Sequence, residues 1–356
     1  MSCTQPHVEV VLLNWNSYDD TADCIRSLDE VKYENLEITV VDNASSDDSL
    51  GKLRSEFPNL KCIEVKENRG FSAGNNIGVR HALSGGTNYV LLLNNDTIVE
   101  PDFLTPLIET AEQNPDVGIV TGKILIAGTN PPRIWCAGGE IDHWRGKGVY
   151  RAHQGADRGE IDEEQYDKNE RVGMASGCMM LIPADVFDHV GLLSEEYFFG
   201  GEEWEFSARV RSNGYDIWYA PESVIFHKVS RSIGQSFDNP WQIYNRERSR
   251  LLFQQSQLAA SKWLGWYVAH WAFKLSLGLL KQRENAQEHP DLSFNEFLKI
   301  NLAAEHDHLV SNSIKKNQLA AVERRFGNES PWSQPRKSGT VLSDSGRSSE
   351  ALHKDG

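Results

Sequence analysis

The first hundred residues alternate short apolar runs with segments of helical spacing. Between the first two runs, Ala22, Ile25 and Leu28 recur at the spacing of one helical face. Runs rich in valine, isoleucine and leucine that alternate with helices are typical of a mostly parallel sheet with helices on both faces. The sequence therefore predicts an α/β fold with a Rossmann-like, mostly parallel sheet. The four runs are VEVVLL from Val8, LEITVV from Leu36, LKCIEV from Leu60 and NYVLLL from Asn88.

Each of these runs ends in polar residues. In open α/β sheets, ligands bind beyond the carboxyl ends of the strands, so we expect a site where these ends meet. The polar ends are LNWNS at 13–17, DNASSDD at 42–48, ENRG at 67–70 and the two amides and one carboxylate of LLLNND at 91–96.

The pattern changes along the rest of the chain. A helix is predicted from Pro101 to about Asn114, and VGIVTG and SGCMMLIP read as further strands. Residues 143–171 are polar and contain glycine, which predicts a long loop. From about Phe326 the chain holds serine, glycine and charge without apolar periodicity, so 326–356 is predicted to be a disordered tail.

Composition removes several classes of function. Acidic residues outnumber basic ones by 51 to 36, for a formal charge of −15, and a nucleic-acid-binding protein would need a basic stripe. The cysteines are five in number and never form CxxC, which disfavours a disulfide framework or a zinc site. The N-terminus has no charged start followed by an apolar core, so we expect a cytoplasmic protein. Neither GxxxxGK[ST] nor GxGxxG occurs, since Gly70, Gly74 and Gly78 are spaced by four.

Several motifs, in order, resemble the inverting glycosyltransferases of family 2, which have the GT-A fold. NNDT, GGEID and ASGCMML are most similar to the rhamnosyltransferase-like and galactofuranosyltransferase-like branch. Composition alone predicts a helical region over 238–325. The resemblance implies a catalytic domain over 1–237, with a nucleotide-sugar half to about 125 and an acceptor half from about 126. It spans roughly Val8 to Leu252 and rests on VVLLNWNS, VVDNASSDDS, ENRGFSAGNNIGVRHA, LLLNNDTIVEPDFL, ASGCMMLIP, EEYFFGGEEWEFSARVRSNGYDIWYAPESVIFH and YNRERSRLLF.

The resemblance implies that a divalent metal, Mg²⁺ or Mn²⁺, sits on the donor diphosphate. The family holds it with an Asp-x-Asp element, and Asn94-Asn95-Asp96 stands at that place. Asp96 matches the metal-binding carboxylate, whereas Asn94 replaces the first aspartate with an amide that binds a cation less strongly. His227, at the end of SVIFH, is implied to contact the metal or the diphosphate; a structural histidine is the alternative.

The resemblance also implies contacts to the nucleotide. Asp42 would bind the base or ribose, with Asn14 and Asn16 nearby, although a helix cap ahead of SSDDSL is the alternative for Asp42. The further donor contacts implied are Arg69, Asn75, Asn94, Asn95 and Arg248, with Arg246 close enough in sequence to be mistaken for Arg248.

Inverting transfer requires one carboxylate that takes the proton of the acceptor hydroxyl. By the resemblance, Glu203 in GGEEWEF matches the second residue of the family's acidic pair and is the implied base; Glu202 is the alternative base. Glu205 is expected on a helix face. An acidic first turn favoured by the helix dipole is the other explanation for these residues. Trp204 would stack on the acceptor sugar or lie in the core.

The segment 241–281 reverses the charge of the chain, with six Lys or Arg, one Glu and four tryptophans. From Trp263 to Leu280 a helix would be apolar almost all round, except along a line through His270 and Lys274. Its eighteen residues would span about 27 Å, which is short for crossing a bilayer. We predict a helix at the inner membrane face or against a lipid-linked acceptor; packing on the catalytic domain or a dimer contact is the alternative.

The sequence therefore predicts an inverting, metal-dependent glycosyltransferase. It would move a sugar from a nucleotide-diphosphate-sugar to a glycan or lipid-linked acceptor, without a covalent glycosyl-enzyme. A degenerate glycan-binding or scaffold protein is one alternative, because Asn94 and the Glu202-Glu203 pair depart from the family pattern. A sugar-phosphate nucleotidyltransferase is another, although it would need a glycine-rich loop with Arg and Lys where this chain has NWNSYDD.

Overall fold

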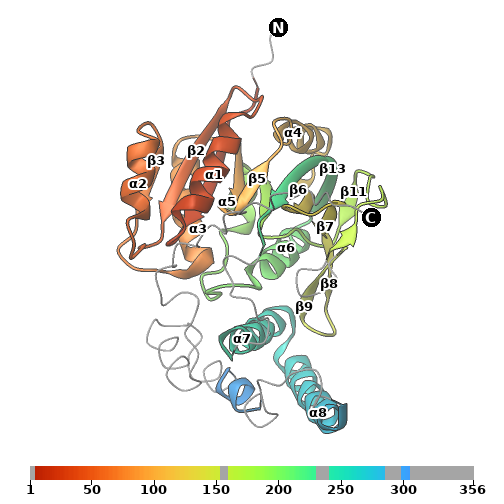
Figure 1. Cartoon of the computed structure of the whole chain (residues 1–356). Coiled ribbons are helices and arrows are strands. Elements are labelled where there is room, and N and C mark those ends of the chain that lie inside the picture. Colours follow the sequence, from red (N-terminus) through yellow and green to blue (C-terminus); the bar gives the residue numbers. More distant parts are fainter. Residues whose placement is uncertain (1–4, 153–158, 230–239, 285–297, 305–356) are drawn as a thin grey trace, which may run out of the picture.

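A computed structural model describes residues 5–152, 159–229, 240–284 and 298–304. It is a mixed α/β fold with one large sheet flanked by helices (Figure 1). The predicted tail at 326–356 lies outside the described residues. The elements are β1 (Val8–Asn14), α1 (Tyr18–Asp29), β2 (Leu36–Asp42), α2 (Ser49–Glu56), β3 (Lys61–Glu64), α3 (Gly70–Ser84), β4 (Tyr89–Leu93), β5 (Thr97–Val99), α4 (Leu104–Gln113), β6 (Val117–Ile126), β7 (Arg133–Cys136), β8 (Gly139–Asp142), β9 (Lys147–Tyr150), β10 (Glu160–Ile161), β11 (Glu170–Val172), β12 (Met179–Pro183), α5 (Ala184–Val190), α6 (Glu202–Ser212), β13 (Asp216–His227), α7 (Pro240–Gln257) and α8 (Ala260–Glu284).

The large sheet has the strand order β10-β7-β6-β12-β4-β1-β2-β3, and β13 pairs with β6, β5 and β11. The half formed by β4, β1, β2 and β3 is parallel, as predicted. In the other half β12 runs antiparallel to both β4 and β6, so the sheet as a whole is mixed. The apolar runs do not reveal this change of direction, because a strand buried on both faces is continuously apolar in either orientation.

Helices cover both faces of the sheet. On one face Ile25 and Leu28 of α1 are buried in the same core as Leu104 and Leu107 of α4. On the other face the buried side chains of α3, α5 and α6 form a second core. The predicted site residues Asn14, Asp42 and Asp96 lie at the carboxyl ends of β1, β2 and β4, and all three are buried.

The segment 143–171 is not the single long loop that its composition predicted. It contains β9, β10 and β11, and β9 forms an antiparallel hairpin with β8. The strand KGVY is short and carries a glycine, so its alternation was too weak to read from sequence. Position 148 requires a glycine for packing, because a Cβ there would lie 2.5 Å from the indole of Trp204.

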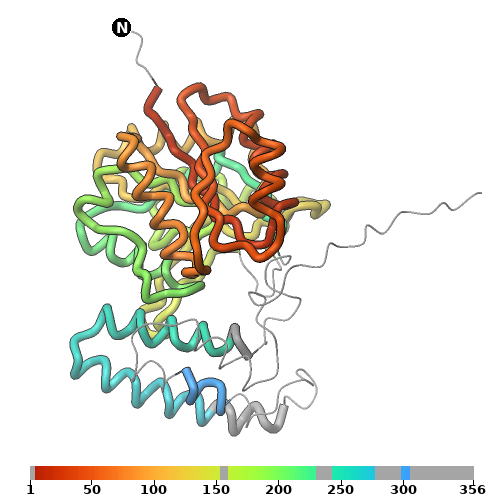
Figure 2. Tube along the Cα trace, turned by 90° about the vertical axis from the view of Figure 1, so that its left-hand side faces the viewer, coloured from red at the N-terminus to blue at the C-terminus, as the bar shows by residue number. Residues whose placement is uncertain are grey.

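The two C-terminal helices lie on one side of the catalytic domain, with α7 nearer the sheet and α8 outside it (Figures 1 and 2). The turn of the β8–β9 hairpin contacts both helices. Gln254 of α7 donates to the carbonyl of His143, and Trp266 of α8 donates to the carbonyl of Trp144 at 2.7 Å. The inner face of this helical region therefore packs on the catalytic domain, which was the alternative prediction.

The polar line of α8 faces inward, not outward. His270 and Lys274 both contact Glu247 of α7, and Trp266 is only 8% exposed. Trp266 therefore contributes to packing and is not the interfacial anchor that composition suggested. The outer face instead exposes Leu264, Val268, Phe273 and Leu275. Among the described residues, no helix combines the length and apolarity needed to span a membrane.

Candidate active site

The ends of β1 and β2 meet in one hydrogen-bonded group. Asn14 and Asp42 are register partners, and Asn14 Nδ2 donates to Asp42 Oδ1 at 2.7 Å. The Ser45 hydroxyl and backbone N–H also donate to the Asp42 carboxylate, at 2.6 and 3.1 Å. Asp42 does not cap α2, whose N-cap residue is Asp48. The capping alternative for Asp42 is therefore wrong, and its carboxylate belongs to the strand-end group.

This group extends across α1 to the NND turn. The Thr21 hydroxyl donates to Asn14 Oδ1 at 2.8 Å and accepts from Asn95 Nδ2 at 2.7 Å. Three strand ends that are far apart in sequence are thus tied by one buried chain of hydrogen bonds. Thr21 was not predicted as a site residue, because a threonine on a helix gives no signal without its neighbours.

Asn16 shapes the loop after β2. Its φ is +50°, and its Oδ1 accepts from the backbone of Ser46 at 2.7 Å. Its Nδ2 is buried and has no partner among the described residues. A buried donor left unpaired costs about 1–3 kcal/mol, so Asn16 Nδ2 is a candidate to donate to a bound ligand.

Asp96 and His227 face each other across β5 and β13. Asp96 Oδ1 lies 3.1 Å from His227 Nε2, and both residues are less than a tenth exposed. The register of β13 on β5 pairs His227 with Thr97, which fixes this approach. The edge of the Trp135 ring rests on the imidazole with 4.7 Å between ring centroids. A carboxylate and an imidazole that converge in a buried site are a donor set that suits a divalent metal.

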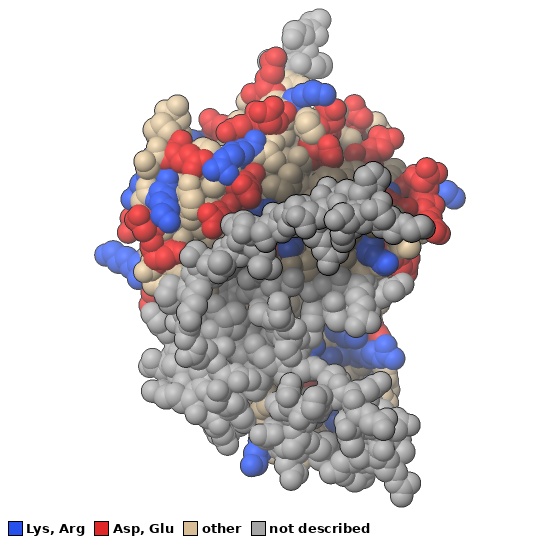
Figure 3. All heavy atoms as spheres, in the orientation of Figure 1, with Lys and Arg blue, Asp and Glu red and all other residues tan. Residues whose placement is uncertain are grey.

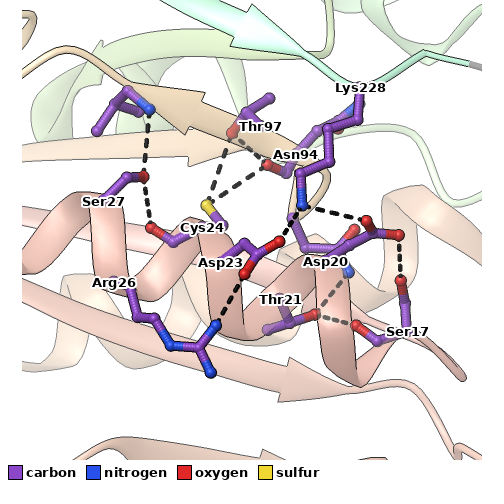
Figure 4. A network of polar contacts seen from close by, with 12 residues as sticks. Ser17, Asp20, Thr21, Asp23, Cys24, Arg26, Ser27, Asn94, Thr97 and Lys228 are labelled. Atoms are coloured by element: carbon purple, nitrogen blue, oxygen red, sulfur yellow. Dashed lines mark hydrogen bonds and ion pairs between the residues drawn. The ribbon is translucent and has the colours of Figure 1, made fainter. Parts of the chain in front are cut away.

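A second charged group lies beside this pair and was missed from sequence. Lys228 Nζ is 2.7 Å from Asp23 Oδ2 and 3.3 Å from Asp20 Oδ1, both on α1. Figure 4 shows the lysine reaching across to α1 next to the Asn94 turn. The Lys228 backbone N–H also donates to the Asp96 carbonyl at 2.9 Å. These contacts anchor the end of β13 to α1 and so help to hold His227 in place.

The predicted acidic pair begins α6. Gly200 and Gly201 have φ of +77° and +97°, a left-handed region that favours glycine, and they turn the chain into the helix. Glu203 Oε2 accepts from the Gly201 N–H at 2.9 Å, and Glu203 Oε1 accepts from the Tyr150 hydroxyl. These two hydrogen bonds fix the direction of the Glu203 carboxylate. Tyr150 lies in the stretch that was predicted as a loop, so this partner was missed.

Glu202 has the opposite environment. Burial, and then the charge of Glu203, raise the pKa of the Glu202 carboxyl well above its ordinary value. Its Oε2 is buried without a partner among the described residues. Glu202 therefore takes up a proton more readily than an ordinary glutamate does. Glu205 makes a salt bridge to Arg209 one turn later, at 2.7 Å, which fits the predicted helix-face position.

The acidic pair and the NND turn approach the same short segment of chain. A Cβ added to Gly177 would lie 3.9 Å from Glu202 Oε1 and 3.7 Å from Glu203 Cβ. The next residue, Cys178, accepts at its carbonyl from the Asn94 N–H at 2.9 Å. Residues 177–178, at the start of β12, therefore separate the two groups by a single backbone segment.

The start of α3 joins this edge through a glycine. Gly70 has φ of +83°, and a Cβ there would lie 2.4 Å from the Phe198 carbonyl. That same carbonyl accepts from the Phe71 N–H at 2.7 Å. Only glycine permits this close approach of ENRG to the loop that precedes the acidic pair.

The remaining predicted residues fall into different environments. The Arg69 guanidinium forms an ion pair with Glu195 at 3.3 Å near the surface. Asn75 is buried and donates to the Phe71 carbonyl of its own helix at 3.0 Å, so it serves the packing of α3. Arg248 is almost fully buried and donates to the Glu196 carbonyl at 3.0 Å, whereas Arg246 is exposed. Trp204 is half-buried and lies against Gly148 of β9.

Among the described residues, one group of three potential metal ligands has atoms within 4.8 Å of one another, and it lies elsewhere. His7, Glu9 and Glu37 are at the amino ends of β1 and β2, opposite to Asn14 and Asp42. Lys61 Nζ already stands 2.5 Å from Glu37 Oε2. An ammonium group there neutralises the carboxylates, so we do not identify this group with the donor metal.

Comparison with known proteins gives a family and a fold. The sequence pattern of Glycosyl transferase family 2 matches residues 9–191, just over half of the chain. The chain is 26% identical over 262 residues to the low-salt glycan biosynthesis hexosyltransferase Agl10 of Haloferax volcanii, covering 71% of this chain and 77% of that protein. It is 30% identical over 119 residues to the poly-beta-1,6-N-acetyl-D-glucosamine synthase of Staphylococcus aureus, covering 33% of this chain but only 28% of the synthase.

A solved structure shares the fold. GalNAc-T7, determined with UDP, GalNAc and Mn²⁺, superposes with a TM-score of 0.54 at 15% identity, covering 84% of this chain and 55% of that one. The central sheet and its flanking helices are thus those of a GT-A glycosyltransferase, as the sequence motifs predicted.

Proposed function

The chain belongs to glycosyltransferase family 2, and we propose that it performs inverting, metal-dependent transfer from a nucleotide-diphosphate-sugar to an acceptor hydroxyl. We further propose a donor of the rhamnosyl or galactofuranosyl type, from the resemblance of NNDT, GGEID and ASGCMML to that branch. The acceptor would be a glycan or a lipid-linked glycan. Membership of the family removes the nucleotidyltransferase alternative.

One observation carries this proposal. The NND turn that carries Asp96 is hydrogen-bonded to Cys178, and the Glu202–Glu203 pair approaches the preceding residue, Gly177, while Asp96 contacts His227. A donor bound along the ends of the parallel strands would place its diphosphate at the Asp96–His227 pair and its sugar toward the Glu202–Glu203 pair. Asp42, Asn14 and Asn16 stand at the neighbouring strand ends and would hold the nucleoside.

The residues at the diphosphate end fit a divalent metal. Asp96 and His227 would hold it, since they converge in a buried site. When bound, such an ion neutralises the charge that develops on a diphosphate leaving group. Asn95 is engaged with Thr21, so it would position the turn and not the ion.

At the sugar end, Glu203 would accept the proton of the attacking acceptor hydroxyl. Tyr150 and the Gly201 N–H would fix the direction of its carboxylate, while burial and the charge of Glu203 raise the pKa of Glu202. A base held in a fixed direction toward the acceptor hydroxyl lowers the barrier to attack at the anomeric carbon. No covalent bond between sugar and protein is needed.

The test is a panel of nucleotide-sugars, each offered with Mn²⁺ and with Mg²⁺. Donor binding to the folded state must raise the melting temperature, and purified protein should then release nucleoside diphosphate from the donor that stabilises it most. A degenerate glycan-binding protein would be stabilised by glycans but would release no nucleotide from any donor, and that result would replace the proposed activity.

A further inference from the structure

Four cationic side chains come together where the β8–β9 hairpin meets α7. We name Arg145, Lys147, Arg246 and Arg250 the basic cluster. Figure 3 shows Lys and Arg side chains gathered at the level of the hairpin turn, whereas acidic side chains dominate the catalytic domain above it. In a chain with a formal charge of −15, such a concentration of positive charge requires an explanation.

Two elements hold the basic cluster. Arg246, Arg250 and Gln254 follow one another at a spacing of four and so share one face of α7. Gln254 on that face donates to the His143 carbonyl, and a Cβ on Gly146 would lie 2.6 Å from it. The face that carries the two arginines is thus turned toward the hairpin that carries Arg145 and Lys147.

Two carboxylates among the described residues offset part of the charge of Arg145, Lys147 and Arg250. Asp142 lies 3.6 Å from Arg145 and is the register partner of Lys147. Glu247 contacts Arg250 at 3.3 Å but is shared with His270 and Lys274 of α8. Arg250 Nε is buried without a partner among the described residues. Burial, and then the charges of Arg250, Arg145 and Arg246, lower the pKa of Lys147, which is the expected result of crowded like charges.

The elements that carry the basic cluster also contact the acidic pair. β9 carries Lys147 and, three residues or about 10 Å later, Tyr150, whose hydroxyl donates to Glu203, although the side chains of Lys147 and Tyr150 point to opposite faces of the strand. On α7, Ser249 precedes Arg250 and donates to the Gly200 carbonyl just before the acidic pair. The NND turn, which leads to the Asp96–His227 pair where the donor diphosphate is proposed to bind, is hydrogen-bonded to Cys178, the residue after the glycine beside the acidic pair.

We propose that the basic cluster is a phosphate subsite, and that it binds a phosphate group carried by the acceptor. Arginine forks match phosphate oxygens two at a time, and the lysine adds a point charge. Its assignment to the acceptor rests on the proposed function, whereas phosphate binding itself does not. The acceptor is accordingly a sugar phosphate or a glycan joined to a phosphate, not a neutral glycan.

The test compares Arg145→Gln/Lys147→Gln with a matched control, Lys168→Gln/Arg211→Gln. The control removes two exposed cations elsewhere on the catalytic domain. Binding of inorganic pyrophosphate and of farnesyl diphosphate is measured by calorimetry in EDTA, which keeps metal away from Asp96. Wild type and control should bind both probes, and the cluster variant should bind at least about tenfold more weakly, the loss expected for charge-assisted hydrogen bonds. Equal binding by all three proteins overturns the proposal.

A stability readout separates this role from a structural one. Because like charges repel, Lys147→Gln should melt at the same or a higher temperature than wild type when no anion is present, while its stabilisation by pyrophosphate falls. If Lys147→Gln lowers the melting temperature and keeps the anion effect, the lysine is a packing residue and the proposal is wrong.

Sedimentation with vesicles distinguishes the sources of the phosphate. Vesicles of phosphatidylglycerol are compared with vesicles of phosphatidylcholine. If the cluster variant no longer binds farnesyl diphosphate but sediments with vesicles like wild type, the result supports the assignment of the cluster to the acceptor phosphate. If the variant still binds farnesyl diphosphate but no longer sediments with phosphatidylglycerol vesicles, the cluster binds a bilayer headgroup, and the acceptor assignment is overturned. Binding of nucleotide-sugar in Mn²⁺ is measured separately. If the protein binds no nucleotide-sugar, the proposed function is refuted, but the measured binding of pyrophosphate to the cluster is unaffected.

Discussion

Exchanging each carboxylate of the acidic pair for an amide should give two very different enzymes. Glu203→Gln removes the group that would accept the proton, so turnover should fall on the order of 10²–10⁴-fold, or about 3–5 kcal/mol in the activation barrier. Glu202→Gln replaces a buried carboxyl, whose pKa is raised by burial and by the charge of Glu203, with a neutral group of the same shape, so turnover should fall less than about tenfold.

The structure also sets the cost to stability of Glu203→Gln. The amide oxygen can still accept from Tyr150, but the amide NH₂ would then face the Gly201 N–H. One buried donor loses its acceptor, which costs about 1–3 kcal/mol. Thermal melts therefore accompany the assay, which measures release of nucleoside diphosphate with saturating donor and acceptor. Donor affinity should be unchanged. If Glu203→Gln keeps nearly normal turnover while Glu202→Gln is inactive, the assignment of Glu203 as the base is refuted.

Three further predictions concern the scaffold. Burial alone would raise the pKa of Glu247, but the hydrogen bond from His270 and the charges of Lys274 and Arg250 lower it to about 2 from an ordinary 4.5. By linkage this carboxylate contributes about 3 kcal/mol at neutral pH, fully present above about pH 4.5 and lost as the pH falls toward about 2. Glu247→Gln should remove this acid-sensitive part of the stability, and chemical denaturation at pH 7 and pH 3 checks it. Gly70→Ala, with a Cβ 2.4 Å from the Phe198 carbonyl at a φ of +83°, should destabilise by about 1–3 kcal/mol, measured against Gly86→Ala, whose positive φ carries no such contact. Leu264→Ser/Val268→Ser should reduce sedimentation with anionic vesicles without lowering the melting temperature, since both side chains are exposed; unchanged sedimentation would contradict a membrane contact through α8.

Local patterns predicted the parallel half of the fold and its strand-end residues. Asn14 and Asp42 follow runs of valine, isoleucine and leucine, and the carboxyl ends of parallel neighbours must meet at one edge. The placement of Asp96 with His227 came from resemblance alone, because 131 positions separate them and no periodicity links β5 to β13. The same limit hid the bond from Thr21 to Asn95 and the contacts of Lys228 with α1.

Composition was a poorer guide where a tertiary contact decides the outcome. Tyr150 could not be recognised as a partner of Glu203 while its segment read as a loop. The sequence showed a polar line on α8 but not its direction, and His270 and Lys274 turn inward because Glu247 on α7 is buried and needs cationic partners. Sequence shows that a helix has two kinds of face, and the neighbouring helix determines which one is covered.

Calorimetric titration of the preferred nucleotide-sugar, in Mn²⁺ and then in EDTA, tests most directly whether the strand-end edge is a metal-dependent donor site. Wild type should bind at least about tenfold more tightly in Mn²⁺, and Asp96→Asn should bind weakly and equally in both buffers, because it removes the carboxylate proposed to hold the ion beside His227. Equal binding by wild type in Mn²⁺ and EDTA, or an Asp96→Asn variant that keeps the full metal effect, would contradict the account.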